Sequence, residues 1–360
     1  MDRPYCASAR PHPAVANISR PPAVSPITRR RALSLGIATA ALVLAAAPLP
    51  GMRRPLLVAI GSELEQPLAG IEPFFERRHP GIDLRWEVQG AQDMVNRNLE
   101  EGPERARVLI PSNRDQLLAF AAAAAARGSG APFQAEPRPI ARTLLVAVAW
   151  PERSDRLFPQ GRFSWARLRQ AAEAGQWTAL GGPEAWGSFD LRVTDPLRSN
   201  SGQLTLALWS RDQPAPAAVA LLKRAVYRPA RSTDILLREF ISGGPNDGDL
   251  AMVYEAAALM RSAEAGRRWP GGYRLLVPDP TVEMVLAAAV LRGEGSGSPA
   301  DGERFVAFMA GPEAQAVLQA AGFRDPDGRG GSPAGNQVRR LPPPERAQLD
   351  ELLRLWQQAG

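Results

Sequence analysis

The chain has 360 residues, of which 45% are hydrophobic and 22% charged, so its composition is ordinary for a globular protein and its length suits two lobes. Six arginines and one aspartate lie in residues 1–47, and the remaining 37 basic and 36 acidic residues leave a net charge of about +1. This balance, with no basic runs interleaved with aromatic residues, argues against a nucleic-acid partner.

Residues 1–47 have the features of an export signal. Arg30 and Arg31 precede a short apolar run at 35–47 that ends in small residues, as in a signal peptide. The paired arginines resemble a twin-arginine leader, although Ala32 stands where that signal favours Phe. We expect a periplasmic or extracellular protein from which this leader is removed. An uncleaved membrane anchor is the alternative, but an apolar run of 13 residues is short for a bilayer.

Strand and helix patterns alternate from residue 52 to residue 141. Continuous apolar runs predict buried strands, and apolar residues at helical spacing predict the helices between them. The expected strands are 55–60, 82–88 and 107–110, and the expected helices are 67–78, 91–100 and one after residue 113. This alternation is typical of a doubly wound α/β lobe.

A long apolar strand at 140–150 is a candidate for a crossing between lobes. Strand and helix patterns also alternate after this strand. We expect strands at 189–193, 250–253 and 273–277, and helices at 164–174, 204–209, 215–226, 232–241, 254–265, 282–291 and 301–319. A flexible Gly- and Pro-rich loop at 325–335 and a final helix at 344–358 complete the prediction.

Cysteine and histidine are too scarce for several kinds of chemistry. Cys6 lies in the expected leader, and His79 is the one histidine that follows the leader. We therefore expect no zinc site, no cysteine nucleophile and, without a Gly-x-Ser-x-Gly sequence, no serine hydrolase. The sequence favours a protein that is not an enzyme and has no cofactor or metal. A glycosidase with paired carboxylates stays open, because carboxylates distant in sequence can meet in space.

The most informative stretch, residues 194–203, reads T-D-P-L-R-S-N-S-G-Q. Pro196 ends the preceding strand because it lacks a backbone donor. Ser199 and Ser201 are favoured N-cap residues for the helix that follows, and Gly202 leaves room for a ligand beside the backbone. A helix N-terminus has free N–H groups and a partial positive charge, so it suits an anion or a polar ligand. A capped helix with no ligand is the alternative.

This stretch resembles the D-P-x-x-S-x-S-G segment of bacterial extracellular solute-binding proteins with the type II periplasmic binding fold. Four other stretches resemble segments of that family in the same order. They are P-L-A-G-I-E-P-F-F-E-R-R-H-P-G at 67–81, P-I-A-R-T-L-L-V-A-V-A-W at 139–150, D-L-A-M-V-Y-E at 249–255, and F-V-A-F-M-A-G-P-E-A-Q with a later G-F-R at 305–324. The branch most similar to the chain holds phosphate- and molybdate-type binders and substrate-binding domains associated with von Willebrand factor A domains.

The resemblance implies an α/β protein with two doubly wound lobes, joined by crossover strands, and a ligand cleft between them. The expected boundaries are 1–47 for the leader, 52–141 for the first part of lobe 1, 142–279 for lobe 2, and 280–360 for the return to lobe 1 and the C-terminal helix. The lobes would close by hinge rotation about crossover strands near 142–149 and 274–283, with the ligand favouring the closed form.

The function that the resemblance implies is capture of a small polar or anionic solute by a monomeric secreted protein. Its partner would be the permease of an ABC importer, although some relatives are linked instead to a von Willebrand factor A domain protein. The alternative is a partner-binding or sensory module that keeps the fold without small-molecule transport. Polar groups converging on the cleft would favour solute binding, and an apolar or collapsed cleft would favour the alternative.

Ligands in open α/β sheets bind outside the carboxyl ends of the strands, so residues that follow strands are the candidates for the site. The predicted ligand-binding residues are Ser62, Ser112, Asn113, Ser199, Ser201, Gly202, Tyr254 and Glu255. Helix capping explains Asn113 equally well. A buried Glu255 would repel a bare oxyanion unless it accepts a proton from the ligand or pairs with an arginine.

Overall fold

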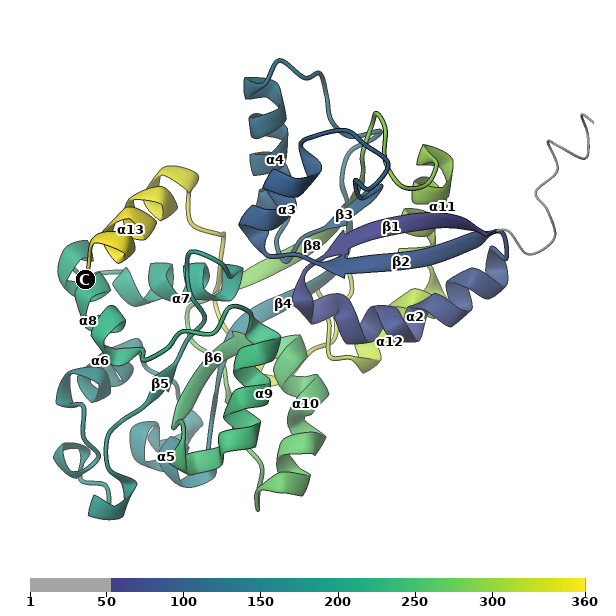
Figure 1. The fold of residues 1–360 in the computed structure, drawn as a ribbon. Coiled ribbons are helices and arrows are strands. Elements are labelled where there is room, and N and C mark those ends of the chain that lie inside the picture. The colour runs from purple at the N-terminus through teal and green to yellow at the C-terminus, as the bar shows by residue number, and fades with distance from the viewer. Residues whose placement is uncertain (1–52, 360) are drawn as a thin grey trace, which may run out of the picture. The chain divides into compact units, whose positions relative to one another are not determined.

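Two hydrophobic cores organise residues 53–359, the part of the chain that the computed structural model describes (Figure 1). The larger core gathers mainly side chains between residues 144 and 284, and we call this part lobe 2. The other core and a smaller layer beside it gather side chains mainly from 56–141 and 286–323, and we call this part lobe 1. The expected leader at 1–47 lies outside the described residues.

Lobe 1 is a sheet with helices on both faces. Its strands are β1 (Arg54–Ile60), β2 (Ile82–Val88) and β3 (Val108–Ile110), and its helices are α2 (Glu65–Arg78), α3 (Ala91–Asn98), α4 (Asp115–Ala126), α11 (Pro299–Met309) and α12 (Pro312–Ala320). β1 is parallel to β2 and β3. Successive residues of a strand face opposite sides, so Val58 packs with α2, α11 and α12, and Ala59 with α3 and α4. Both faces of β1 are buried, which explains its uninterrupted apolar run.

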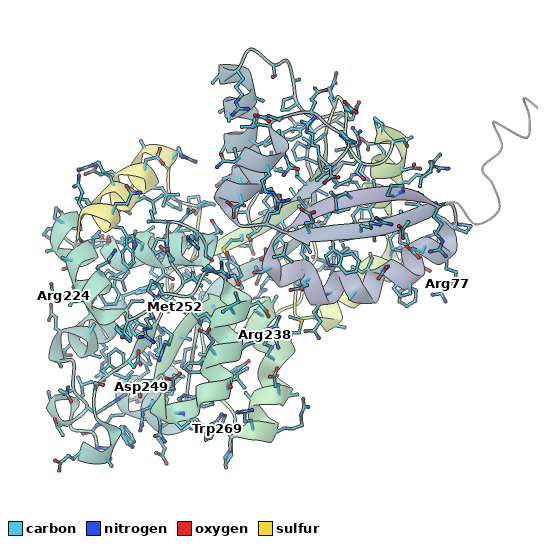
Figure 2. All side chains as sticks on the ribbon, viewed as in Figure 1. Arg77, Arg224, Arg238, Asp249, Met252 and Trp269 are labelled. Atoms are coloured by element: carbon cyan, nitrogen blue, oxygen red, sulfur yellow. The ribbon has the colours of Figure 1, made fainter. Side chains whose placement is uncertain are left out.

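Lobe 2 surrounds a second set of strands. These are β5 (Leu191–Arg192), β6 (Leu250–Tyr254) and β7 (Arg274–Leu276), with helices α5 (Pro151–Leu157), α6 (Trp165–Ala174), α7 (Asn200–Ser210), α8 (Ala215–Ala225), α9 (Thr233–Gly243) and α10 (Glu255–Arg268). Figure 2 shows Met252 and Asp249 inside this lobe, whereas Arg224 projects from its surface. The buried carboxylate of Asp249 pairs with Arg153 and accepts the N–H of Asp190, so it joins α5 to the start of β5.

Two long antiparallel strands, β4 (Arg138–Ala149) and β8 (Thr281–Val290), connect the lobes. Residues 138–144 of β4 pair with β8, and residues 145–149 pair with β6 and β7. The other end of β8 pairs with β3 of lobe 1. The strand order is β2-β1-β3-β8-β4-β6-β5, so hydrogen-bonded strands run from one lobe into the other.

The prediction of a helix at 282–291 is wrong, because this segment forms most of β8. Its residues include three consecutive alanines and two leucines, which favour a helix when the segment is considered alone. In the structure they pair with β4 and β3, and this pairing overrides the local preference. The second crossing is therefore β8, whereas the segment expected at 273–277 contributes only the short strand β7.

A third segment, residues 324–345, leads from lobe 1 back to lobe 2. Arg324 forms a β-bridge with Arg142 of β4, and β9 (Arg340–Leu341) pairs with the start of β8. The last helix, α13 (Arg346–Gln358), then packs on α7 and α8 of lobe 2, as Figure 1 shows. Leu352 and Trp356 bury its apolar side in the lobe 2 core.

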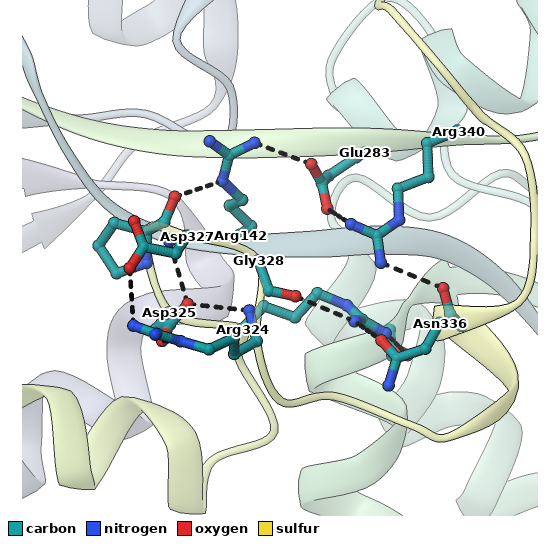
Figure 3. Close-up of polar contacts among 12 residues, drawn as sticks. Arg142, Glu283, Arg324, Asp325, Asp327, Gly328, Asn336 and Arg340 are labelled. Atoms are coloured by element: carbon teal, nitrogen blue, oxygen red, sulfur yellow. Dashed lines mark hydrogen bonds and ion pairs between the residues drawn. The ribbon is translucent and has the colours of Figure 1, made fainter.

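The Gly- and Pro-rich loop at 325–335, which its composition predicts to be flexible, has hydrogen bonds of its own. The carboxylate of Asp325 accepts the backbone N–H groups of Asp327 and Arg329, and it also accepts the Arg329 side chain (Figure 3). A short polar side chain that bonds the backbone two and four residues ahead fixes a turn without regular secondary structure.

Ion pairs fasten this third segment to the crossing strands. Glu283 of β8 accepts hydrogen bonds from Arg142 of β4 and from Arg340 of β9, at 2.9 and 2.8 Å (Figure 3). Arg324 is fully buried and donates two bonds, of 2.9 and 2.8 Å, to the two carboxylate oxygens of Glu255, the first residue of α10. The network therefore joins β4, β8 and the start of α10.

Replacing Arg324 with methionine should strongly destabilise the protein. The change leaves the buried carboxyl of Glu255 without its bidentate partner, and breaking such a pair from one side lowers the free energy of unfolding by about 3–5 kcal/mol. Denaturant unfolding followed by circular dichroism measures the loss. Arg354→Met, which removes an exposed pair with Glu351, is the matched control and should barely move the midpoint. Equal midpoints for the two variants would contradict the role given to Arg324.

Candidate functional site

Polar side chains from both lobes meet where three strands end. Glu63 follows β1 in the short 3-10 helix η1 (Ser62–Leu64), and Ser112 follows β3, both in lobe 1. Tyr254 is the last residue of β6, and Asn200 is the first residue of α7, both in lobe 2. We call Glu63, Ser112, Asn200 and Tyr254 the polar cluster. It occupies the place where this kind of sheet presents ligands.

Short distances define the polar cluster. The side-chain amide of Asn200 donates to the hydroxyl of Tyr254 at 3.2 Å. Gly61 lies against both Glu63 and Ser112. A Cβ at this position would lie 2.5 Å from Oε1 of Glu63 and 2.5 Å from Oγ of Ser112. Only glycine fits there, because any side chain would push the two polar groups apart.

Glu63 is the unusual member of the polar cluster. Its residue is 4% exposed, and its Oε1 atom has no hydrogen-bond partner within residues 53–359. Burial raises the pKa of the Glu63 carboxyl, and the opposing effects of its own backbone N–H and of the Ser112 hydroxyl are smaller. A buried acceptor without a partner is rare in proteins, so it marks a place where a further donor belongs.

Tyr254 supplies a neutral hydroxyl beside this carboxyl. Burial, and then the negative charge of Glu63, raise the pKa of Tyr254, while the Asn200 amide and the Ser112 hydroxyl lower it by smaller amounts. The phenol therefore stays protonated at neutral pH. Since its oxygen already accepts from Asn200, its proton remains available for an acceptor.

A groove of about 380 Å³ opens next to η1, between the two lobes. It is lined by Ser62, Glu65, Gln66, Ala69 and Trp86 of lobe 1 and by Asp234, Arg238, Met260 and Arg261 of lobe 2. Its two arginines are both paired with Asp234, so neither is a free cation. The groove can hold a small molecule, and Ser62 connects it to the neighbouring Glu63.

Ser201 of the central motif has its hydrogen-bonding capacity filled inside lobe 2. Its hydroxyl lies 2.8 Å from that of Thr194, 3.2 Å from that of Ser199 and 2.7 Å from that of Thr233. A hydroxyl has one hydrogen and two lone pairs, so three partners use them all. The geometry gives the Ser201 hydroxyl an internal role.

Gly202 is required by the packing of the chain. A Cβ on it would lie 2.4 Å from the carbonyl oxygen of Thr194 and 2.9 Å from the nitrogen of Pro196. Ser199 is the N-cap residue of α7, but its side chain makes no capping hydrogen bond. The first N–H groups of α7 therefore have no side-chain cap from Ser199, and they point out of the helix end that carries Asn200.

Two other predicted site residues, Asn113 and Glu255, also have hydrogen-bond partners inside the protein. Asn113 is buried and its Oδ1 accepts the N–H of Asp115 at 3.3 Å, whereas the N-cap residue of α4 is Arg114. Glu255 is committed to Arg324 and also accepts from Ser332. Ligand binding by all these residues stays a prediction. The contacts favour it for Ser62, Ser112 and Tyr254, and they give Asn113, Ser201, Gly202 and Glu255 internal partners.

Sequence reasoning missed Glu63 and Asn200. Glu63 directly follows Ser62 after a buried strand, and Asn200 lies between the two serines of the central motif, so position alone pointed to both. Side-chain type pointed elsewhere, because glutamate is rarely buried without a partner. Their contacts, across 54 residues for Asn200 and Tyr254, are visible only in the fold.

The residues described at 53–359 show no group of three or more His, Cys, Asp or Glu side chains placed to hold a metal ion. In the same range, none of the helices has both the length and the apolarity needed to cross a bilayer.

The two lobes, the crossing strands and the polar site between them define a two-lobed α/β binding protein. The fold is that of type II periplasmic binding proteins, as the resemblance implied. Iron-bound HitA from Pseudomonas aeruginosa is similar, with a TM-score of 0.61, 18% identity, and coverage of 85% of this chain and 99% of that one. The substrate-binding protein of an ABC transporter from Agrobacterium tumefaciens has a TM-score of 0.62, 14% identity, and coverage of 86% and 95%.

A third similar structure is the sulfate-binding protein SubI from Mycobacterium tuberculosis H37Rv, with a TM-score of 0.55, 17% identity, and coverage of 76% of this chain and 87% of that one. No curated protein sequence matches the chain. The sequence profile of the family described as bacterial extracellular solute-binding protein matches residues 56–324. The chain therefore belongs to this family.

Glu63→Gln should make the solute-free protein more stable at neutral and alkaline pH. The raised pKa means that the folded state holds a proton that the unfolded state releases above its ordinary pKa of about 4.3, so wild-type stability falls as pH rises. Each unit of raised pKa corresponds to about 1.4 kcal/mol. Thermal melts between pH 4 and pH 8 should show the variant's advantage growing with pH. Parallel melting curves at every pH would contradict the unpartnered state of Glu63.

Proposed function

We propose that this protein captures a small polar or anionic solute between its two lobes. The observation that carries the proposal is the polar cluster, in which each lobe supplies two side chains and one buried carboxylate oxygen lacks a partner. The groove beside it supplies space for the rest of the solute. Polar groups converging on a site between lobes support solute binding over a module whose cleft is apolar or collapsed.

The proposed mechanism is closure of the lobes around β4 and β8. Glu63 and Ser112 move with lobe 1, and Asn200 and Tyr254 move with lobe 2, so only the closed form brings all four together. A solute that contacts both pairs binds the closed form more tightly and shifts the population towards it. Closure would then signal occupancy to a partner, which in this proposal is an ABC importer permease.

Native mass spectrometry of protein purified from its own host tests solute capture. The wild-type protein should carry one small molecule that denaturation releases. Tyr254→Phe removes the hydroxyl that Asn200 contacts in the polar cluster, and the loss of a neutral hydrogen bond of about 0.5–1.5 kcal/mol should weaken binding roughly two- to tenfold. Tyr227→Phe, at a tyrosine that is 66% exposed, is the matched control and should bind like the wild type. Equal loss of the molecule from both variants, or no bound molecule in the wild type, would count against the proposal.

Export is part of the same proposal. The mature protein should lack residues 1–47, and N-terminal sequencing of the periplasmic form checks this. Lysine at both Arg30 and Arg31 keeps the charge but removes the paired arginines, so precursor should accumulate in the cytoplasm if the route is twin-arginine. Normal export of this double variant would exclude that route, and a mature protein that begins at Met1 would exclude the leader.

A further inference from the structure

The polar cluster has a negative pole in lobe 1. Glu63 is buried, its Oε1 is unpartnered, and the side chains around it, Ser112 and Tyr254, are neutral. No arginine or lysine within residues 53–359 hydrogen-bonds to Glu63, and the groove arginines Arg238 and Arg261 are bound to Asp234. In the empty fold burial favours the protonated carboxyl, whereas a bound ammonium group favours the ionised carboxylate and gives Oε1 the donor that it lacks.

The polar cluster also has a positive pole, in lobe 2. α7 has 11 residues, and its first residue, Asn200, bonds to Tyr254 of the polar cluster. Because the Ser199 side chain does not cap α7, the first N–H groups keep their capacity to bind an anion, and the helix dipole adds a partial positive charge. A cation alone would meet this positive end. The unpartnered carboxylate oxygen of Glu63 is the independent sign that the same place receives a ligand.

Both poles belong to the polar cluster. Asn200, the first residue of α7, donates to the Tyr254 hydroxyl at 3.2 Å, and Glu63 lies beside Ser112 in the other lobe. A solute that satisfies both poles therefore carries both charges on one small molecule. Each lobe supplies one pole, so only a solute with both charges gains from both lobes on closure.

We propose that the solute is a small zwitterion of the α-amino acid type, with its ammonium group on Oε1 of Glu63 and its carboxylate on the N-terminus of α7. The ammonium donates a charge-assisted hydrogen bond to the buried carboxylate oxygen that lacks a donor. The carboxylate accepts the first N–H groups of α7. The groove beside Ser62, lined in part by Trp86 and Met260, receives the side chain of the solute. This inference rests on the proposed function.

Isothermal titration of the full chain, freed of bound solute by unfolding and refolding, tests the charge requirement. The probes are the common L-amino acids, together with sulfate and molybdate. At least one amino acid should bind with a one-to-one ratio. For that amino acid, the amine that lacks its carboxylate and the acid that lacks its amine should each bind at least tenfold more weakly. These comparisons use the wild-type protein alone, so they do not depend on the folding of any variant.

Two variants test which residues form the negative and the positive pole. Glu63→Gln removes the negative pole, and Asn200→Asp puts a carboxylate at the positive pole. Each variant should therefore lower the affinity for the amino acid at least tenfold. Glu351→Gln, on the exposed face of α13, makes the same charge change as Glu63→Gln and should leave affinity unchanged. Full affinity in either pole variant would overturn the assignment.

The outcomes separate this inference from the proposed function. Binding of sulfate or molybdate without binding of any amino acid would overturn the zwitterion and leave solute capture standing. A host-derived molecule without an amine, found by mass spectrometry, would do the same. Failure of every probe, with no bound molecule in protein from the host, would overturn both.

Discussion

The buried ion pair between Arg324 and Glu255 is the contact on which the site geometry depends. Glu255 directly follows Tyr254, so the pair fixes the point where β6 becomes α10 and where the tyrosine hydroxyl reaches the polar cluster. Arg324 itself is bridged to Arg142 of β4. One side chain therefore links the crossing strand, the return segment and a site residue, and a shift of the crossing region would move Tyr254. A buried pair of this kind contributes more to a specific arrangement than to stability, because removing two charges from water offsets much of their attraction.

Much of the fold follows from local pattern, but one crossing does not. The apolar runs of β1 and β4 identify strands that are buried on both sides, and the alternation of strands and helices identifies the α/β class. Local pattern does not identify the segment 282–291 as a strand, because its alanines and leucines fit a helix as well as a strand. Only the pairing with β4, whose residues are more than 130 positions away, decides between them. A sequence read in windows cannot contain that information.

Local sequence also fails to show which side chains of the candidate site are free to bind a ligand. The rule that ligands lie beyond strand ends predicts Ser62, Ser112 and Tyr254 as site residues, because it depends on the fold alone. Whether a hydroxyl there is free depends on its neighbours. The Ser201 hydroxyl hydrogen-bonds to that of Thr233, 32 residues away. The Glu255 carboxylate pairs with Arg324, 69 residues away. The serines of the motif therefore bond within their own lobe, whereas the unpartnered acceptor lies on Glu63 in the opposite lobe.

In the proposed mechanism, the unpartnered carboxyl makes closure of the empty protein less favourable. In an open form, water would solvate Glu63. Closure without a solute buries its Oε1 with no donor, and the desolvation of an unpaired acceptor opposes that step. A solute that brings a donor removes this penalty and adds its own contacts, so the same atom disfavours empty closure and favours occupied closure. The difference between the two closed forms is what a transporter would need to distinguish an occupied binding protein from an empty one. An arginine permanently paired with Glu63 would stabilise the closed fold and abolish that difference.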